Sequence, residues 1–160
     1  MTVETVRAFF RANAPDITIT EHTESTASVA EAAATIGVEP GQIAKTLAVR
    51  IGERVVLVVT RGDARLDNKK LKAAFGGRPS MLSAEIVAEI TGHPVGGVCP
   101  FGLAKPLPVY CDISLKDFGH VHPAAGSRNS SVCITPERLA ELTDAQWTDL
   151  CQPRPEAKAA

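Results

Sequence analysis

Several features that mark common functional classes are missing from this 160-residue chain. No apolar run approaches the roughly 18 residues that a membrane-spanning helix needs, and the first residues hold a glutamate and no long apolar stretch, unlike a secretory signal. The net charge of −1 argues against a protein that coats nucleic acids generally. With 44% hydrophobic and 22% charged residues, a disordered chain is excluded. We therefore expect a cytoplasmic globular protein with no membrane or DNA partner.

Short catalytic and metal-binding motifs are also missing. The chain holds no G-x-x-x-x-G-K-[ST] phosphate loop and no Gly-x-Ser-x-Gly elbow. None of the four cysteines forms a C-x-x-C pair, the close spacing by which one turn points two sulfurs at a metal or redox centre. We therefore expect free thiols in a reducing compartment. These cysteines are Cys99, Cys111, Cys133 and Cys151.

Charge is unevenly distributed along the chain. Residues 45–78 hold nine basic and three acidic side chains, whereas the segments before and after them are net acidic. A basic middle third could face a partner that carries phosphates. The alternative is that these are ordinary solvated charges on a strand edge and a helix.

Local patterns predict an α+β fold with a mixed, curled, barrel-like sheet flanked by helices, because they lack the regular alternation of βαβ units. Gly52-Glu53 joins two β-rich runs as a hairpin, and Asp67, Ser83 and Thr135 are candidate helix caps. We expect one domain over residues 1–152 and an extended tail over 153–160. Helices are expected over 3–13, 29–36, 67–75, 83–90 and from 136, with Trp147 and Leu150 beyond a break; a helical turn is expected over 40–44; strands are expected over 17–20, 47–51, 55–60, 109–113, 121–122 and 132–134.

Lys45 is the first candidate site residue. It stands where the predicted turn enters a predicted strand, flanked by apolar residues. A lysine held at such a boundary can be a fixed cation that binds a phosphate or a carboxylate. The alternative is an exposed lysine at the start of a strand.

The second candidate is the loop over residues 92–102, which holds four glycines and two prolines. Backbone amides at Gly96 and Gly97 could hold a carbonyl oxygen or an oxyanion. Cys99 lies in the same loop, six residues after His93, and is a possible thiol nucleophile with its base. The alternative is a structural turn.

A third loop, residues 123–131, is rich in small and polar residues and could line a tight pocket or be an ordinary solvated loop. Just before it, His120 and His122 stand at i and i+2 on one face of a strand, as a metal half-site would. No carboxylate or cysteine completes that site at a suitable spacing, so we expect no metal.

Taken together, the chain resembles the YbaK family, also described as the prolyl-tRNA-synthetase-associated editing domain. The resemblance covers roughly residues 3–143 and rests on four segments in the family's order. These are V-E-P-G-Q-I-A-K-T-L at 38–47, G-D-A-R-L-D-N-K-K-L at 62–71, T-G-H-P-V-G-G-V-C-P-F-G at 91–102 and P-A-A-G-S-R-N at 123–129.

The resemblance implies trans-editing, which is hydrolysis of the ester between a wrong amino acid and its tRNA. It implies that Lys45 positions the terminal adenosine and its phosphate, and that the amides of Gly96 and Gly97 hold the aminoacyl carbonyl. Water and the 2′-hydroxyl of the substrate would replace a protein nucleophile, with no cofactor. The substrate-binding residues implied are Thr46, Val98, Cys99, Pro100, Ala124, Ala125, Gly126, Ser127 and Asn129.

The third loop departs from the cysteinyl-tRNA deacylases of this family. They carry Ser-Gly-Gly where this chain has Ala124-Ala125-Gly126, and Ser131 stands near their aspartate position. An aromatic residue expected near Thr20 is also missing. Since these positions shape the amino-acid pocket, the resemblance carries the reaction class and not the amino acid removed.

The sequence therefore predicts an aminoacyl-tRNA deacylase acting on tRNA for proline that carries a small non-cognate amino acid, with prolyl-tRNA synthetase as a further partner. Two alternatives remain open. One is a module of the same fold that binds tRNA ends or nucleotides without hydrolysis. The other is a hydrolase of a different small ester or thioester that uses Cys99.

Overall fold

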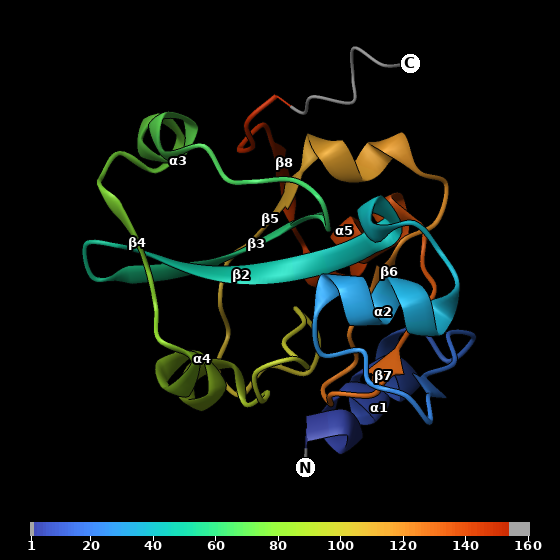
Figure 1. Cartoon of the computed structure of the whole chain (residues 1–160). Coiled ribbons are helices and arrows are strands. Elements are labelled where there is room, and N and C mark those ends of the chain that lie inside the picture. Colours follow the sequence, from blue (N-terminus) through green and yellow to red (C-terminus); the bar gives the residue numbers. More distant parts are fainter. Residues whose placement is uncertain (1, 154–160) are drawn as a thin grey trace.

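A computed structural model describes residues 2–153 of the protein, so most of the predicted tail lies outside the described residues. Helices and strands alternate irregularly along the chain (Figure 1). In chain order the elements are α1 (Thr2–Asn13), β1 (Thr20–Glu21), α2 (Val29–Ile36), the 3-10 helix η1 (Pro40–Gln42), β2 (Ile43–Ile51), β3 (Arg54–Arg61), α3 (Asn68–Phe75), β4 (Pro79–Met81), α4 (Ala84–Thr91), β5 (Val109–Asp112), the 3-10 helix η2 (Ile113–Asp117), β6 (His122–Pro123), β7 (Ser130–Ser131), α5 (Pro136–Thr143) and β8 (Gln146–Thr148).

The main sheet is mixed and has the strand order β4-β2-β3-β5-β8. The hairpin of β2 and β3 is antiparallel, while β5 and β8 run parallel to their neighbours and β6 pairs in parallel with the start of β2. This confirms the predicted α+β class. Within residues 2–153 no pairing joins β4 to β8, so the barrel-like curl expected from the sequence is not supported.

The central hairpin is buried on both faces, which explains its nearly continuous apolar sequence. Val56 and Val58 of β3 point to a cluster that contains Leu71 of α3. Leu57 and Val59 point to the larger cluster, which includes Phe10 of α1. In Figure 1, α3 and α4 accordingly lie on opposite sides of the hairpin.

Helix boundaries follow the capping residues that the sequence offers. The side chains of Asp67, Ser83 and Thr135 each accept hydrogen bonds from backbone amides in the first turn of α3, α4 and α5. Such caps satisfy amides that have no partner inside the helix. The three predicted helix starts are therefore confirmed.

Predictions for the strands are less accurate. Of the strand expected over 17–20, only Thr20 lies in a strand, β1, which pairs with β7 rather than with the main sheet. The strand expected over 109–113 ends at Asp112, whose carboxylate caps η2. Residues 132–134 contribute one isolated bridge between Ile134 and Val121, and Trp147 lies in β8. These pairings link distant segments, which local pattern cannot reveal.

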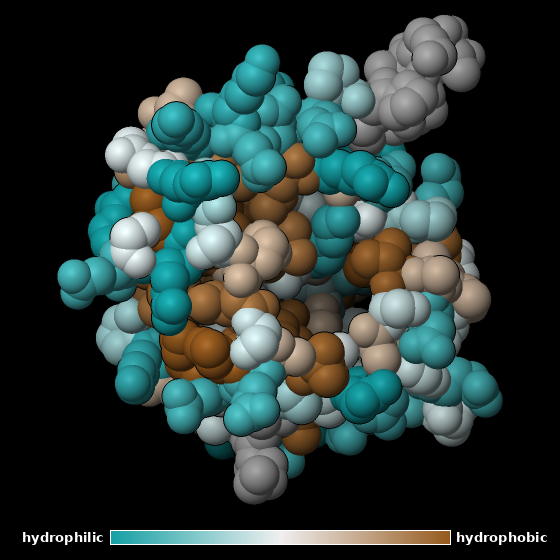
Figure 2. Space-filling view, turned by 60° about the vertical axis from the view of Figure 1, so that its left-hand side comes forward, coloured by the Kyte–Doolittle hydropathy of each residue, from teal (hydrophilic) through white to brown (hydrophobic). Residues whose placement is uncertain are grey.

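Apolar side chains gather near the centre of the face that carries β4, with hydrophilic side chains around them (Figure 2). A hollow of about 440 Å³ opens there between β2, α3 and β4, and the Met81 side chain at its edge is 58% exposed. Among residues 2–153 no helix is long and apolar enough to span a membrane.

Candidate active site

A small cavity of about 80 Å³ lies where β2 begins. Its walls come from the segment that enters α2, from α2 itself, from the start of β2, from the glycine-rich loop and from β6 and β7. The space suits a small group and is well below the size of a typical ligand pocket. The lining residues are Thr26, Ala27, Ser28, Val29, Ala32, Ile36, Ile43, Ala44, Lys45, Gly96, His122, Ala124, Ser130 and Ser131.

Lys45 is half-buried within β2, because that strand starts at Ile43, directly after η1, rather than at 47 as expected. Its Nζ donates a hydrogen bond of 2.6 Å to the carbonyl oxygen of Ala64. Burial lowers the pKa of the Lys45 ammonium, while Cys151 and Asp63 act against that shift. The Lys45 side chain is therefore held in place by a backbone carbonyl and is not the exposed lysine of the alternative.

Thr46, the neighbour of Lys45, takes a different position. Successive side chains of a strand point to opposite faces, so Thr46 points away from Lys45. Its Oγ1 is buried with no hydrogen-bond partner among residues 2–153, and Thr46 is not part of the cavity wall. Lys45 and Thr46, which were both predicted to contact the substrate, therefore lie on opposite faces of β2.

Gly96 lies on the cavity wall with a backbone φ of +89°, a conformation that favours glycine. A Cβ atom there would approach the Cβ of Ala27 to 2.9 Å. Within residues 2–153 the Gly96 N–H makes no backbone hydrogen bond. The Gly97 N–H, by contrast, donates to Pro94 O at 2.9 Å, so of these two predicted amides only that of Gly96 is open, that is, without a backbone partner among residues 2–153.

The two predicted loops pack against each other through Gly97. Its carbonyl accepts a hydrogen bond from the Gly126 N–H at 3.0 Å, and a Cβ at Gly97 would lie 2.6 Å from Ser127 N. This close approach explains why glycine stands at position 97. The structure thus brings both loops to one site, although they are about 30 residues apart in the sequence.

Cys99 and Pro100 are buried behind the cavity wall, and neither they nor Val98 line the cavity. The Cys99 Sγ lies 3.7 Å from His93 Nε2, so the two residues do meet. However, the stronger partner of His93 Nε2 is Phe101 O at 2.7 Å. A carbonyl accepts only from a protonated ring nitrogen, so this nitrogen has no lone pair for the thiol.

Burial raises the pKa of the Cys99 thiol to about 12. Both Cys99 and His93 are completely buried. Because the thiolate is the nucleophile, an inaccessible thiol that stays protonated is unsuited to catalysis. The geometry therefore disfavours the hydrolase that would use Cys99.

In the third loop only Ala124 of the predicted binding residues lines the cavity. Ala125 and Gly126 are buried beside it. Ser127 Oγ donates to Ser130 Oγ at 2.6 Å, and Asn129 Nδ2 donates to the His22 carbonyl at 2.8 Å. Ser127 and Asn129 therefore fix the loop and its neighbour rather than face the cavity.

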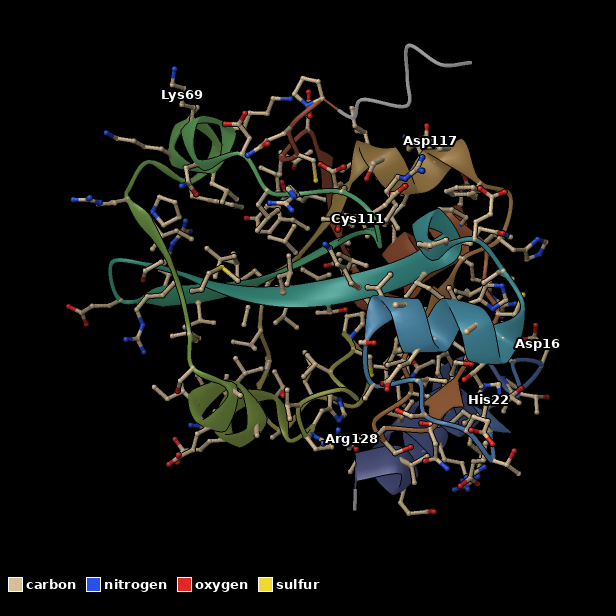
Figure 3. The ribbon with its side chains drawn as sticks, in the orientation of Figure 1. Asp16, His22, Lys69, Cys111, Asp117 and Arg128 are labelled. Carbon is tan, nitrogen blue, oxygen red and sulfur yellow. The ribbon has the colours of Figure 1, made fainter. Side chains whose placement is uncertain are left out.

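One histidine lines the cavity and a second contacts one of its lining residues, an arrangement that the sequence interpretation did not anticipate. His22 Nε2 lies 2.8 Å from the Oγ of Ser131, and His22 lies beside β7 in Figure 3. His122 lines the same cavity, whereas His120 lines a separate hollow with Asp16 and Cys133. His120 and His122 thus line two different hollows. Residues 2–153 contain no group of three or more metal-ligating side chains.

Thr26 was missed by the sequence analysis, because a single hydroxyl residue in a polar loop carries no local signal, whereas Ser131 belongs to the third predicted loop and lines the cavity. Thr26 reaches the cavity because its backbone N–H donates to Arg128 O at 2.7 Å, which ties the segment before α2 to the third loop. This contact extends the pairing of β1 with β7, which brings the two segments side by side.

Comparison with known proteins identifies the family. The sequence model of the family described as "Aminoacyl-tRNA editing domain" matches residues 23–142. The chain is 47% identical over 154 residues to "Uncharacterized protein YwhH" of Bacillus subtilis (strain 168), covering 95% of this chain and 98% of that protein. This chain belongs to the aminoacyl-tRNA editing domain family.

Two further matches carry functional names. The chain is 33% identical over 129 residues to "Putative Cys-tRNA(Pro)/Cys-tRNA(Cys) deacylase EbsC" of Enterococcus faecalis (strain ATCC 700802 / V583), covering 79% of this chain and 76% of that protein. A crystal structure described as that of "a putative trans-editing enzyme for prolyl tRNA synthetase" superposes with a TM-score of 0.88 at 33% identity, covering 94% and 97% of the two chains.

The part of the chain that matches the editing-domain family contains the whole cavity. Every lining residue, from Thr26 to Ser131, falls within residues 23–142. Lys45 and the open amide of Gly96 therefore lie within the editing domain itself.

Proposed function

We propose that this protein is a trans-editing aminoacyl-tRNA deacylase. It hydrolyses the ester between a small non-cognate amino acid and tRNA for proline, in the cytoplasm, with residues 1–152 acting as one editing domain. The observation that carries the proposal is that a half-buried lysine and an open backbone amide lie on the walls of one small cavity in a member of the editing family.

Lys45 binds the end of the tRNA. An ammonium group has three donors, and one is used by Ala64 O. The remaining donors can hold a phosphate of the terminal nucleotide, and the partial burial of the lysine strengthens that interaction relative to water. Lys45 thereby fixes the ester at the cavity mouth.

Gly96 acts on the ester carbonyl. Its open N–H can donate to the carbonyl oxygen, whose negative charge grows as water attacks. Water is the nucleophile, because the buried Cys99 thiol stays protonated and cannot serve as one. The 2′-hydroxyl of the terminal ribose orients this water. The ester bond breaks to release the amino acid and tRNA with a free 3′ end.

The cavity sets the size of the amino acid. Four alanines and Gly96 leave about 80 Å³ between them, which admits a small side chain and sterically excludes a large one. Similarity to the structure described as that of "a putative trans-editing enzyme for prolyl tRNA synthetase" supports tRNA for proline as the substrate and that synthetase as a partner.

The test is a deacylation screen. The purified protein is incubated with tRNA for proline charged with alanine, cysteine, serine, threonine or 2-aminobutyrate, with Lys45→Ala in parallel. We expect hydrolysis of one or two of these esters that depends on Lys45. If the charged tRNA binds but no ester is hydrolysed, across this and other tRNAs, the protein is a binding module and the proposal is wrong.

A further inference from the structure

A cluster of charged groups lies next to Lys45 and outside the cavity. Arg61, at the end of β3, is only 7% exposed. Its Nε and Nη2 donate to the two carboxylate oxygens of Asp63, at 2.5 and 2.8 Å, and its Nη1 donates to Asp117 at 2.9 Å. Asp117 lies on η2, near the top of Figure 3. We call the pair of Arg61 and Asp63 the clamp; Asp117 contacts it from outside.

Neighbouring residues hold the clamp tightly. The Arg61 guanidinium carbon lies 4.7 Å from the centre of the Phe118 ring. A Cβ at Gly41 would lie 2.6 Å from Arg61 Nη2 and 2.9 Å from the Phe118 ring, so only glycine admits the guanidinium there. Gly41 is part of η1, which leads directly into β2 and Lys45. The arginine therefore has little room to adopt another position.

The clamp fixes the loop that binds Lys45. Asp63 directly precedes Ala64, whose carbonyl accepts the Lys45 Nζ hydrogen bond, and the Ala64 N–H donates to Arg61 O at 3.2 Å. The far end of the loop is held by the C-terminal segment, because Gln152 N donates to Arg65 O at 2.8 Å. Residues 61–65 are thus anchored at both ends.

We propose that Asp63 is a positioning residue: by its bidentate pair with Arg61 it sets the Ala64 carbonyl at the place where that carbonyl holds the Lys45 ammonium. This rests on the proposed function for its catalytic consequence and on the geometry alone for the position of Lys45. Asp117 pairs with the same arginine but comes from η2, so it supports the clamp without being part of the loop.

The charges around Lys45 mean that the proposal can be tested through the pH profile of activity as well as through stability. Burial lowers the pKa of the Lys45 ammonium and Arg65 adds to that shift, whereas the Asp63 carboxylate acts against it. Loss of the Asp63 charge therefore lowers the Lys45 pKa, and any activity that needs the ammonium is lost at a lower pH. A residue that only stabilised the fold would not move this limb of the pH profile.

The experiment compares Asp63→Asn with Asp117→Asn as the matched control, since each removes one carboxylate from Arg61. In the deacylation assay we expect Asp63→Asn to lower kcat about tenfold or more with little change in KM, because small displacements of a positioning group are costly. The alkaline limb of its pH profile shifts to lower pH. For Asp117→Asn we expect a kcat within about threefold of the wild-type value and an unchanged alkaline limb.

A second measurement does not depend on activity. NMR of the lysine NH₃⁺ groups reports whether Lys45 is held, because exchange with water is slow only for a hydrogen-bonded ammonium. We expect a Lys45 signal in the wild type and in Asp117→Asn, and its loss in Asp63→Asn. If both variants keep the signal, or if both lose it equally, Asp63 has no special positioning role and the inference is wrong.

The two measurements separate the two proposals. If the wild type hydrolyses no charged tRNA but Asp63→Asn alone loses the lysine signal, the deacylase function fails and the positioning of Lys45 stands. If the wild type is active and the two variants have equal kcat and pH profiles, the deacylase function stands and the inference fails.

Discussion

Lys45 and Cys99 are both reactive residues that the sequence offers as candidates for the site, but the structure gives them opposite chemistry. Lys45 is half-buried at a cavity wall, and its ammonium is held by the Ala64 carbonyl. Cys99 is completely buried, and its neighbour His93 donates its Nε2 proton to Phe101 O. A reactive side chain becomes functional only where it has both a partner for its charged form and access to substrate.

The largest expected effect is that of Lys45→Ala on deacylation. We predict a loss of about 100-fold or more, because the substrate loses the fixed cation that orients it. The melting temperature should change by only a few degrees, since no apolar core is lost. Single-turnover kinetics together with thermal unfolding checks both. Hydrolysis at the wild-type rate would remove Lys45 from the mechanism.

The sequence predicted the fold class and several helix ends because these depend on local chemistry. Asp67, Ser83 and Thr135 cap helices as expected. It also singled out Lys45, through its apolar neighbours. It could not predict that Ala64 holds Lys45, or that Arg61 pairs with Asp117, because those contacts join residues that lie 19 and 56 positions apart.

The cavity shows the same limit. Thr26, Gly96 and Ser131 meet only because β1 pairs with β7 and the third loop packs on Gly97. Of the site residues that the resemblance to editing domains implies, Lys45, Gly96 and Ala124 line the cavity. It did not indicate that Thr46, Val98, Cys99 and Asn129 lie outside the cavity wall.

Gly96→Ala should have the second-largest effect. The new Cβ would lie 2.9 Å from Ala27 at a φ of +89°, so the amide and the cavity wall must shift. We expect deacylation to fall about tenfold or more. Gly52→Ala is the control, because it has a positive φ at the hairpin turn but nothing within 4 Å of the new Cβ. Equal activity of Gly96→Ala and Gly52→Ala would refute an essential amide at Gly96.

Cys99→Ser should have the opposite effect to Lys45→Ala: stability falls while activity is kept. Deacylation per folded molecule should stay within about twofold, while the free energy of unfolding falls by about 1–2 kcal/mol, because a more polar group replaces a buried thiol. Urea unfolding and the deacylation assay measure the two quantities. Cys133→Ser, at an exposed position, is the control that should change neither. A large loss of activity without a loss of stability would reinstate Cys99.

The smallest effect is expected from thiol alkylation of the native protein. Burial raises the pKa of Cys99, Cys111 and Cys151 to about 12. A thiolate forms above its pKa, so these three stay protonated at pH 8 and at pH 9. We expect one fast-reacting thiol, the exposed Cys133, and unchanged deacylation after alkylation. Rapid modification of a second thiol, accompanied by inactivation, would contradict this.

The most direct test of the account measures single-turnover deacylation of one charged tRNA by Lys45→Ala and Cys99→Ser side by side, each normalised to folded protein. The account predicts that Lys45→Ala loses about 100-fold or more and that Cys99→Ser retains nearly the wild-type rate. A rate that survives Lys45→Ala but disappears with Cys99→Ser would show that the chemistry lies at the buried thiol and not at the cavity.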